Sequence, residues 1–158
     1  MLFERGMAFV IETERLRIRP ADRGDCAAIS GLIAQLGYEA TEVEVLGRLA
    51  EMDAEQRLVL VAELDGAVVG CLSTSVMRVL HRPAPVGRIS MMVVDQAVRG
   101  RRIGAALVRC AEKALHERGC YMVEVTSHMR RADAHRFYER LGYERTSVRL
   151  ARELRDEN

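Results

Sequence analysis

Apolar and polar residues alternate over residues 9–19, where Leu16 and Ile18 stand among charged side chains. A period of two is typical of a strand with one buried face. Pro20 ends the pattern, because proline lacks the amide that a sheet ladder needs. We therefore predict a first strand over residues 9–19.

The next two segments repeat apolar residues every three or four positions, which indicates two amphipathic helices. The first can be capped by Asp22 or Asp25 and ends at Gly37. The second begins at Thr41, with Glu44 three residues later in the pattern of a capping box. Its buried face is expected to contain three apolar residues: Val45, Leu46 and Leu49.

Residues 57–64 and 67–80 are rich in β-branched and apolar residues, and Asp65-Gly66 separates them. Asp-Gly between two such runs is a strong signal of a tight hairpin, so we predict that the two strands pair antiparallel. Two prolines make residues 81–85 a loop. A further strand, rich in Ile, Met and Val, is predicted over residues 86–95.

After this strand we predict a helix that ends at Gly119, a short strand over residues 121–126, a helix over 132–141 and a last strand over 143–151. The predicted element order is β-α-α-β-β-β-α-β-α-β. Because a strand–helix–strand unit favours parallel neighbours, the fold class is α/β with a mixed sheet and helices on both faces.

The turn between the strand over residues 86–95 and the following helix has the composition of an anion-binding loop. Three arginines fall within four residues, Arg99 to Arg102, and Gly100 and Gly104 permit a close approach of the backbone. The first amides of a helix lack intrahelical acceptors and carry partial positive charge, so a pyrophosphate suits this position. A solvated basic turn is the alternative interpretation.

Length and charge narrow the functional classes. A chain of 158 residues suffices for one core, and 24 Lys and Arg against 23 Asp and Glu provide no global field for nucleic acid or a membrane surface. No apolar stretch is long enough for a spanning helix, and the four cysteines lack metal-ligand spacing, so we expect a cytoplasmic protein without a metal. Either Met1 or Met7 serves as the start.

Two motifs resemble those of a known family. The segment from Val94 to Leu107 is similar to the acyl-coenzyme A signature, Arg/Gln-x-x-Gly-x-Gly/Ala, of the GNAT superfamily of N-acetyltransferases, and residues 134–143, AHRFYERLGY, resemble that family's Ala-x-x-Phe-Tyr-x-x-x-Gly-Phe/Tyr motif. The resemblance implies a single acyl-CoA N-acyltransferase domain over residues 8–152.

The same resemblance implies acetyl-CoA as cosubstrate. Backbone groups of one strand would hold the pantetheine arm, and a backbone N–H of that strand would polarise the acetyl oxygen. Tyr138 would protonate the departing thiolate as the catalytic residue. The implied cofactor-binding residues are Met92, Val93, Val94, Arg99, Gly100, Arg101, Arg102, Ile103, Gly104 and Ala105.

This chain departs from the family pattern at four places. Arg102 stands where the first glycine of the signature is usual, and Arg131 stands where an asparagine is frequent. Residues 88–91 of the strand before the basic turn, where the family often places a general-base glutamate, contain no carboxylate, which leaves Glu124, His128 or a chain of water molecules as candidates. The terminal hairpin of the family is expected to be shortened.

The function that follows is N-acetyl transfer from acetyl-CoA to a primary amine of a small molecule or a peptide, by direct attack in a ternary complex. The alternatives are a non-catalytic acyl-CoA sensor of the same fold and a nucleic-acid contact made by the arginines. Acceptor choice would depend on loops 36–45 and 80–87 and on the final strand. In the first of these loops, the acidic cluster of Glu39, Glu42 and Glu44 attracts a cationic amine or is simply solvated. Dimerisation through edge strands remains open.

Overall fold

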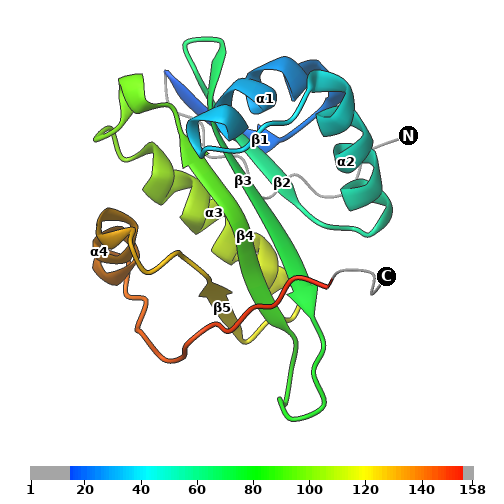
Figure 1. Cartoon of the computed structure of the whole chain (residues 1–158), viewed down its shortest axis with the longest axis vertical. Helices are drawn as coiled ribbons and strands as arrows, with labels where there is room; N and C mark the ends of the chain where they lie inside the picture. The colour runs from blue at the N-terminus through cyan, green and yellow to red at the C-terminus, as the bar shows by residue number, and fades with distance from the viewer. Residues whose placement is uncertain (1–14, 155–158) are drawn as a thin grey trace. The chain divides into compact units, whose positions relative to one another are not determined.

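Five strands pair in their order along the chain to form one mixed sheet (Figure 1). The structure is a computed structural model that describes residues 15–154, in two units divided between Val125 and Thr126. The strands belong to the first unit and are β1 (Leu16–Pro20), β2 (Val59–Leu64), β3 (Ala67–Met77), β4 (Val86–Val94) and β5 (Met122–Val125). β1 to β4 are antiparallel neighbours, whereas β4 and β5 are parallel, as the element order predicts.

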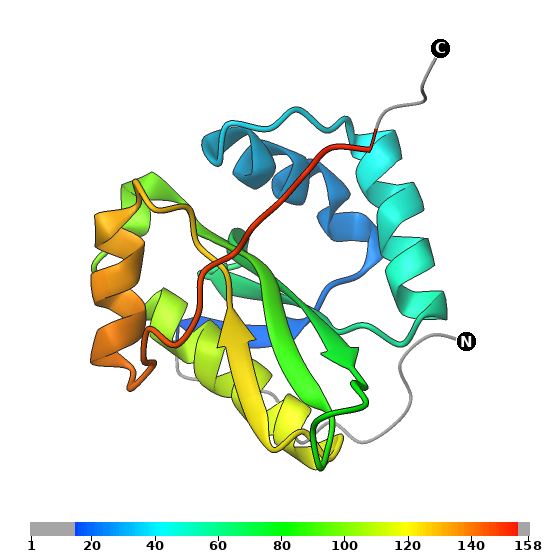
Figure 2. The ribbon, with the colours of Figure 1, turned by 60° about the horizontal axis from the view of Figure 1, so that its bottom comes forward.

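Three α-helices of the first unit cover the sheet from both sides (Figure 2). They are α1 (Cys26–Gln35), α2 (Glu42–Ala54) and α3 (Ile103–Glu117). Cys71 packs with residues of α1, while a side chain at the neighbouring Gly70 would meet Leu107 of α3 at 3.1 Å. Neighbouring residues of a strand point to opposite faces, so α1 and α3 lie on opposite faces of the sheet.

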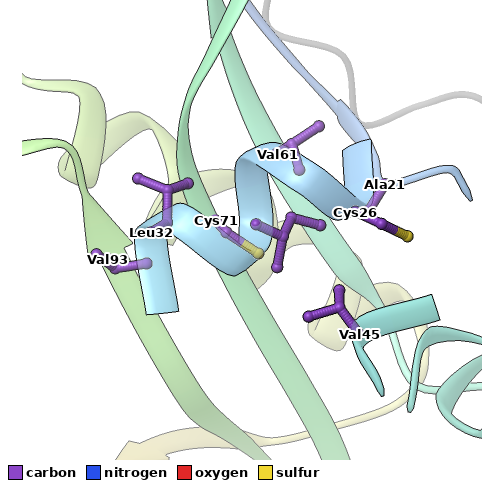
Figure 3. Packing of buried hydrophobic residues seen from close by; sticks show 8 residues of the cluster. Ala21, Cys26, Leu32, Val45, Val61, Cys71 and Val93 are labelled. Atoms are coloured by element: carbon purple, nitrogen blue, oxygen red, sulfur yellow. The ribbon is translucent and has the colours of Figure 1, made fainter. Parts of the chain in front are cut away.

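The core between α1, α2 and the sheet is a cluster of small and medium apolar side chains (Figure 3). Val61, Cys71 and Val93 contribute from three adjacent strands, and Leu32 and Val45 contribute from the two helices. All are at most 3% exposed. Burial of these side chains therefore fixes the two helices on this face of the sheet.

The start of α2 forms as its capping residues predict, whereas Asp25, the N-cap residue of α1, makes no side-chain capping bond. Thr41 and Glu44 make a reciprocal capping box at the start of α2. Asp22 caps a short 3-10 turn, η1 (Arg23–Asp25), which leads directly into α1. The prediction for the buried face of α2 is wrong at Leu46, which is 43% exposed, since the helix packs only a narrow stripe around Val45 against the core.

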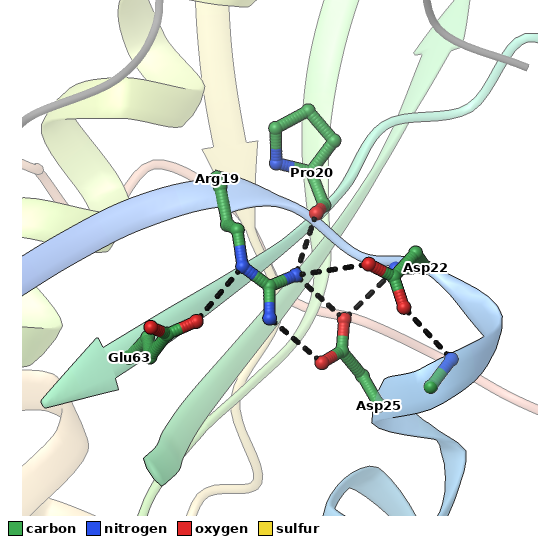
Figure 4. Close-up of polar contacts among 6 residues, drawn as sticks. Arg19, Pro20, Asp22, Asp25 and Glu63 are labelled. Atoms are coloured by element: carbon green, nitrogen blue, oxygen red, sulfur yellow. Dashed lines mark hydrogen bonds and ion pairs between the residues drawn. The ribbon is translucent and has the colours of Figure 1, made fainter. Parts of the chain in front are cut away.

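A partly buried ion-pair network joins the end of β1 to η1 (Figure 4). Arg19 donates two hydrogen bonds to the carboxylate of Asp25, at 2.8 and 2.9 Å, and one to Glu63 of β2 at 3.0 Å. The side chains of Arg19 and Asp25 are 17% and 6% exposed. The pair therefore holds the chain in the sharp path from strand to helix.

The hairpin prediction is confirmed. Asp65 (φ 50°) and Gly66 (φ 84°) occupy the turn between β2 and β3, and positive φ at both positions is the geometry of a type I′ turn. The first strand begins at Leu16 in the described residues, and the part predicted over residues 9–14 lies outside them, as do Met1 and Met7.

The second unit contains α4 (Ala132–Arg140), which ends before Gly142 at φ 93° as predicted. Tyr138 makes edge contacts with the rings of Phe137 and Tyr143, with centroids 5.0 and 5.4 Å apart. The predicted strand over residues 143–151 is wrong, because this segment forms no strand in the described structure. Val148 and Leu150 are 81% and 92% exposed, and an alternating pattern without a paired neighbour does not stabilise a strand.

Candidate functional site

A β-bulge on β4 separates the strand from β5. Ser73 pairs with Met91 and Thr74 with Ile89, so Ser90 is the extra residue on β4. The β4–β5 ladder ends at the same point, with Ile89 opposite Val125. A bulge bends its strand and increases the local twist. β4 therefore continues to Val94, beyond Ile89, which is its last residue paired with β5.

The basic turn follows directly from this part of β4. Asp95 accepts a hydrogen bond from the amide of Ala97 at 2.9 Å and caps a short turn, η2 (Gln96–Val98). Arg99 Nε donates to the carbonyl of Val94 at 3.1 Å. These local bonds tie the turn to the end of the strand and set its direction toward α3.

Two residues of the turn adopt left-handed backbone conformations, Gly100 with φ 82° and Arg102 with φ 61°. Arg102 is the N-cap residue of α3, and its carbonyl accepts the first helical bond, from Ala106 at 3.1 Å. The amides of residues 103–105 therefore occupy the first turn, where a helix has N–H groups without intrahelical acceptors. Arg102, which stands where the family signature usually has glycine, thus adopts a glycine-like backbone conformation.

The arginines of the turn are exposed, and Gly100 faces open space. The charge of Arg101 also reaches the β2–β3 turn: the pKa of Asp65 is lowered mainly by the hydrogen bond from Arg15 and, to a smaller degree, by Arg101. An exposed basic turn at a helix start, with room above Gly100, is compatible with a pyrophosphate.

The ten predicted cofactor-binding residues lie in two adjoining segments of the first unit. Met92, Val93 and Val94 form the end of β4, and residues 99–105 form the turn and the first helical turn of α3. Tyr138 belongs to the second unit, in α4, where it is 7% exposed. Burial raises its pKa to about 12, and the charge of Arg131 opposes this rise in part.

The general-base candidates have different surroundings. Glu124 on β5 accepts a hydrogen bond from Arg88 Nε at 2.8 Å and a second one from Nη2 of the same guanidinium. His128 is exposed, and its Nδ1 accepts from the amide of Arg130 at 3.2 Å. In the acidic cluster, Glu44 is engaged by the capping box of α2. Glu124 is thus engaged by Arg88, and both hydrogen bonds end on its Oε1 atom.

A pocket of about 530 Å³ lies in the first unit, beside the bulge. Its lining comes from three segments: residues 55–57 after α2, residues 75–77 of β3, and Arg88 with Ser90 of β4. Ser90 also shares a hydrogen bond of 2.9 Å with Ser73. Sequence reasoning missed this pocket, although a charged residue, Arg88, within an otherwise apolar strand was an available signal.

Metal and membrane features are absent from the part of the chain that the structure describes. Residues 15–154 contain no group of three or more His, Cys, Asp or Glu side chains that could hold a metal ion. No helix within the same residues has the length and apolarity needed to cross a membrane. All four cysteines, which lie in this range, are buried free thiols, and burial raises the pKa of Cys71 to about 12.

Known proteins are similar to this chain in sequence and in fold. Residues 17–143 match the model of the acetyltransferase (GNAT) family. An aminoalkylphosphonate N-acetyltransferase of Salmonella typhimurium is 31% identical over 142 residues, covering 87% of this chain and 90% of that protein. A glucosamine 6-phosphate N-acetyltransferase of Oryza sativa subsp. japonica is 31% identical over 147 residues, covering 87% and 86%.

A solved structure supports the fold assignment. The structure of an aminoglycoside N-acetyltransferase in complex with CoA superposes with a TM-score of 0.79 at 19% identity and covers 98% of this chain and 99% of that one. At this identity the likeness concerns the fold alone. The predicted α/β fold with a mixed sheet is confirmed by this match and by the family model.

Proposed function

Because this chain belongs to the GNAT family of acetyltransferases, we propose that it transfers the acetyl group of acetyl-CoA to a primary amine of a small molecule. The family match carries the proposal, since residues 17–143 include both the basic turn and the Phe-Tyr motif of α4. The domain is proposed to span residues 8–152 and to act in the cytoplasm, where reduced thiols such as these four persist.

Acetyl-CoA supplies an activated acetyl group in this reaction. Its diphosphate is assigned to the turn and helix start of residues 99–105, and its pantetheine arm to the backbone of Met92, Val93 and Val94. The support is the run of β4 beyond the β5 ladder, together with the exposed arginines and the open space above Gly100. Backbone groups at a strand end can pair with an extended ligand as with another strand.

The acceptor must lose a proton before its nitrogen attacks the thioester carbonyl carbon. For an alkylammonium with a pKa near that of lysine, this costs roughly 4 to 5 kcal/mol at pH 7. The new C–N bond forms, the C–S bond breaks, and a backbone N–H near residues 92–94 polarises the acetyl oxygen. We assign the lost proton to water, with Glu124 and His128 as the two side-chain alternatives.

Tyr138 is proposed to assist the departing sulfur. With a pKa of about 12 the phenol is protonated throughout the neutral range, so it has a proton to donate. Full transfer to a thiolate with a pKa near 8.5 would be uphill by roughly 5 kcal/mol. We therefore expect Tyr138 to act chiefly as a hydrogen-bond donor that stabilises the thiolate as the C–S bond breaks.

The acceptor is proposed to be a small amine that also carries a phosphonate or phosphate group. Two curated relatives with 31% identity are named for acceptors of this kind, an aminoalkylphosphonate and glucosamine 6-phosphate. A peptide acceptor and association into a homodimer stay predictions from the sequence. A CoA sensor without turnover is the second candidate, favoured only by the absence of a carboxylate on β4 near the bulge.

The proposal is tested by free thiol release from acetyl-CoA with a panel of amines. We expect turnover by the wild type and a 10- to 100-fold loss of kcat for Tyr138→Phe, which lacks the donor. Tyr121→Phe is the matched control, because Tyr121 is 45% exposed on the first unit and accepts a hydrogen bond from Arg82. Tight CoA binding without turnover on any amine would favour the sensor instead.

A further inference from the structure

The pocket beside the β4 bulge holds charged groups that the proposed reaction does not use. Its floor is formed by β3 and β4, where Ser75, Arg88 and Ser90 lie on the face of the sheet opposite α3. Glu55 and Arg57 stand at another side. A polar pocket next to the point where β4 and β5 diverge has the position and the chemistry of a binding site for a small polar ligand.

The charges in and around the pocket are balanced and arranged as two ion pairs. Arg88 pairs with Glu124 across the parallel strands, and Arg57 Nε lies 2.7 Å from Glu55. A site for a purely cationic amine would be dominated by carboxylates. Two guanidinium groups beside two carboxylates instead match a ligand that carries both signs of charge.

Arg88 has hydrogen-bond donors beyond those that it gives to Glu124, and they can bind a further anion. A guanidinium has five N–H donors in a planar fork, and the bonds from Nε and Nη2 to Glu124 converge on one oxygen, Oε1. The Arg88 side chain is 39% exposed, so the rest of the fork is accessible from the pocket. Glu124 thus orients the guanidinium while its remaining donors face a ligand.

We propose that Arg88 binds the anionic group of the acceptor, with the hydroxyls of Ser75 and Ser90 as further donors, and that it thereby selects amines bearing a phosphonate or phosphate. This inference rests on the proposed acetyl transfer and names the class of acceptor that the site selects. Arg88 is two residues before the bulge residue Ser90 on β4, so their Cα atoms are separated by roughly 7 Å along the strand.

That separation suits a short dipolar acceptor. The anionic group lies on Arg88, and the amine, two or three carbon atoms away, lies near Ser90, where β4 leaves β5. The pocket volume of about 530 Å³ exceeds what an aminoalkylphosphonate needs and also admits an amino sugar phosphate. An acceptor with a second ammonium group in place of the anion would bring that charge against the guanidinium.

The test compares 2-aminoethylphosphonate with ethanolamine, a neutral-tailed amine, and with 1,3-diaminopropane, at saturating acetyl-CoA. Arg88→Gln is expected to lower kcat/KM for the phosphonate roughly 10- to 100-fold, mainly through KM, since it removes charge-assisted hydrogen bonds. Activity toward ethanolamine should change less than about twofold. Arg88→Lys should recover part of the loss, because it restores the charge without the planar fork.

Arg109→Gln is the matched control, because Arg109 is an exposed arginine on α3, on the other side of the sheet. A thermal unfolding curve for each variant confirms that it is folded. Calorimetric titration of 2-aminoethylphosphonate into the complex with CoA provides a readout independent of turnover, and Arg88→Gln should weaken this binding by the same factor.

The two proposals fail in different ways. Equal losses for all three amines, or unchanged phosphonate kinetics and binding in Arg88→Gln, would overturn the role of Arg88 while acetyl transfer stands. Absence of phosphonate binding to the wild-type complex would overturn it as well. Acetyl transfer itself fails if the wild type releases no thiol with any amine, whatever the calorimetry shows.

Discussion

Arg102 adopts a backbone conformation that L-residues with a side chain seldom accept. Its φ is 61°, at the N-cap of α3, in a signature position where the family usually has glycine. A left-handed conformation costs a non-glycine residue roughly 1–2 kcal/mol. Because the flanking strand and helix are well packed, the chain tolerates this strain and gains an exposed guanidinium at the helix start.

Arg102→Gly should therefore raise the free energy of unfolding by about 0.5–1 kcal/mol. Relief of the left-handed strain exceeds the extra conformational entropy of glycine in the unfolded chain, about 0.5–1 kcal/mol. Urea denaturation followed by circular dichroism measures the difference. Arg101→Gly, at a position without positive φ, is the control and should lower stability by about the entropic amount. Equal effects of the two substitutions would refute the strain.

At the scale of elements, side-chain ion pairs hold the connection from β1 to α1. Arg19 there bonds to Asp25 and Glu63, and the Asp25 carboxylate also accepts from the amide of Asp22 at 2.8 Å. Burial raises the pKa of Asp25, but the hydrogen bonds from Arg19 and the Asp22 amide outweigh this and leave the pKa below its ordinary value of 3.8. The network thus couples the register of β1 to the start of α1.

Arg19→Met should destabilise the protein by about 3 kcal/mol, because it leaves the buried Asp25 carboxylate without its cation. The double variant with Asp25→Asn should lose less than the sum of the two single variants, since no unpaired charge remains at the buried position 25. Denaturant unfolding at pH 7 of the complete cycle measures the coupling. Additive losses would mean that the pair contributes no interaction of its own.

The same network predicts the acid response. Since the folded-state pKa of Asp25 lies below its unfolded value, its contribution to stability is present above about pH 4 and is lost as the pH falls through the folded-state pKa. In Asp25→Asn the unfolding free energy should therefore fall less steeply below pH 4 than in the wild type. Glu117→Gln, which removes an exposed carboxylate on α3, is the comparison variant. An unchanged acid slope in Asp25→Asn would contradict the lowered pKa.

For the whole molecule, binding of CoA to the turn before α3 should appear as added stability. A ligand present at about 100 times its Kd adds roughly 2.7 kcal/mol to the free energy of unfolding. We expect CoA to raise the thermal midpoint, and pantetheine, which lacks the diphosphate, to have a much smaller effect at equal concentration. Equal stabilisation by both compounds would show that residues 99–105 do not hold the diphosphate.

Most elements were predictable from local patterns. The capping box at Thr41, the Asp65-Gly66 turn and the glycine ends of helices depend on bonds within a few residues, which one segment can form by itself. The bulge at Ser90 escaped prediction, because it depends on how β4 pairs with β3. The pocket escaped for the same reason, since its three lining segments are distant in the sequence.

The last predicted strand shows where an alternating sequence pattern is not sufficient to predict structure. Residues 143–151 alternate as a strand does, yet they form none, because a strand is stable only when another strand accepts its hydrogen bonds. The exposure of Leu46 was mispredicted for the same reason, since the face that a helix buries depends on the elements that pack against it.

The sequence by itself determined the element order, the helix caps, the basic turn and the family of this protein, because these depend on residues close together in the chain. Only the tertiary structure decided where β4 leaves β5, that Arg102 takes a glycine-like conformation, and that Arg88 reaches Glu124 across the two strands. The physical reason is that pairing register and ion pairs between strands depend on the free energy of the assembled sheet, and no single segment contains that information.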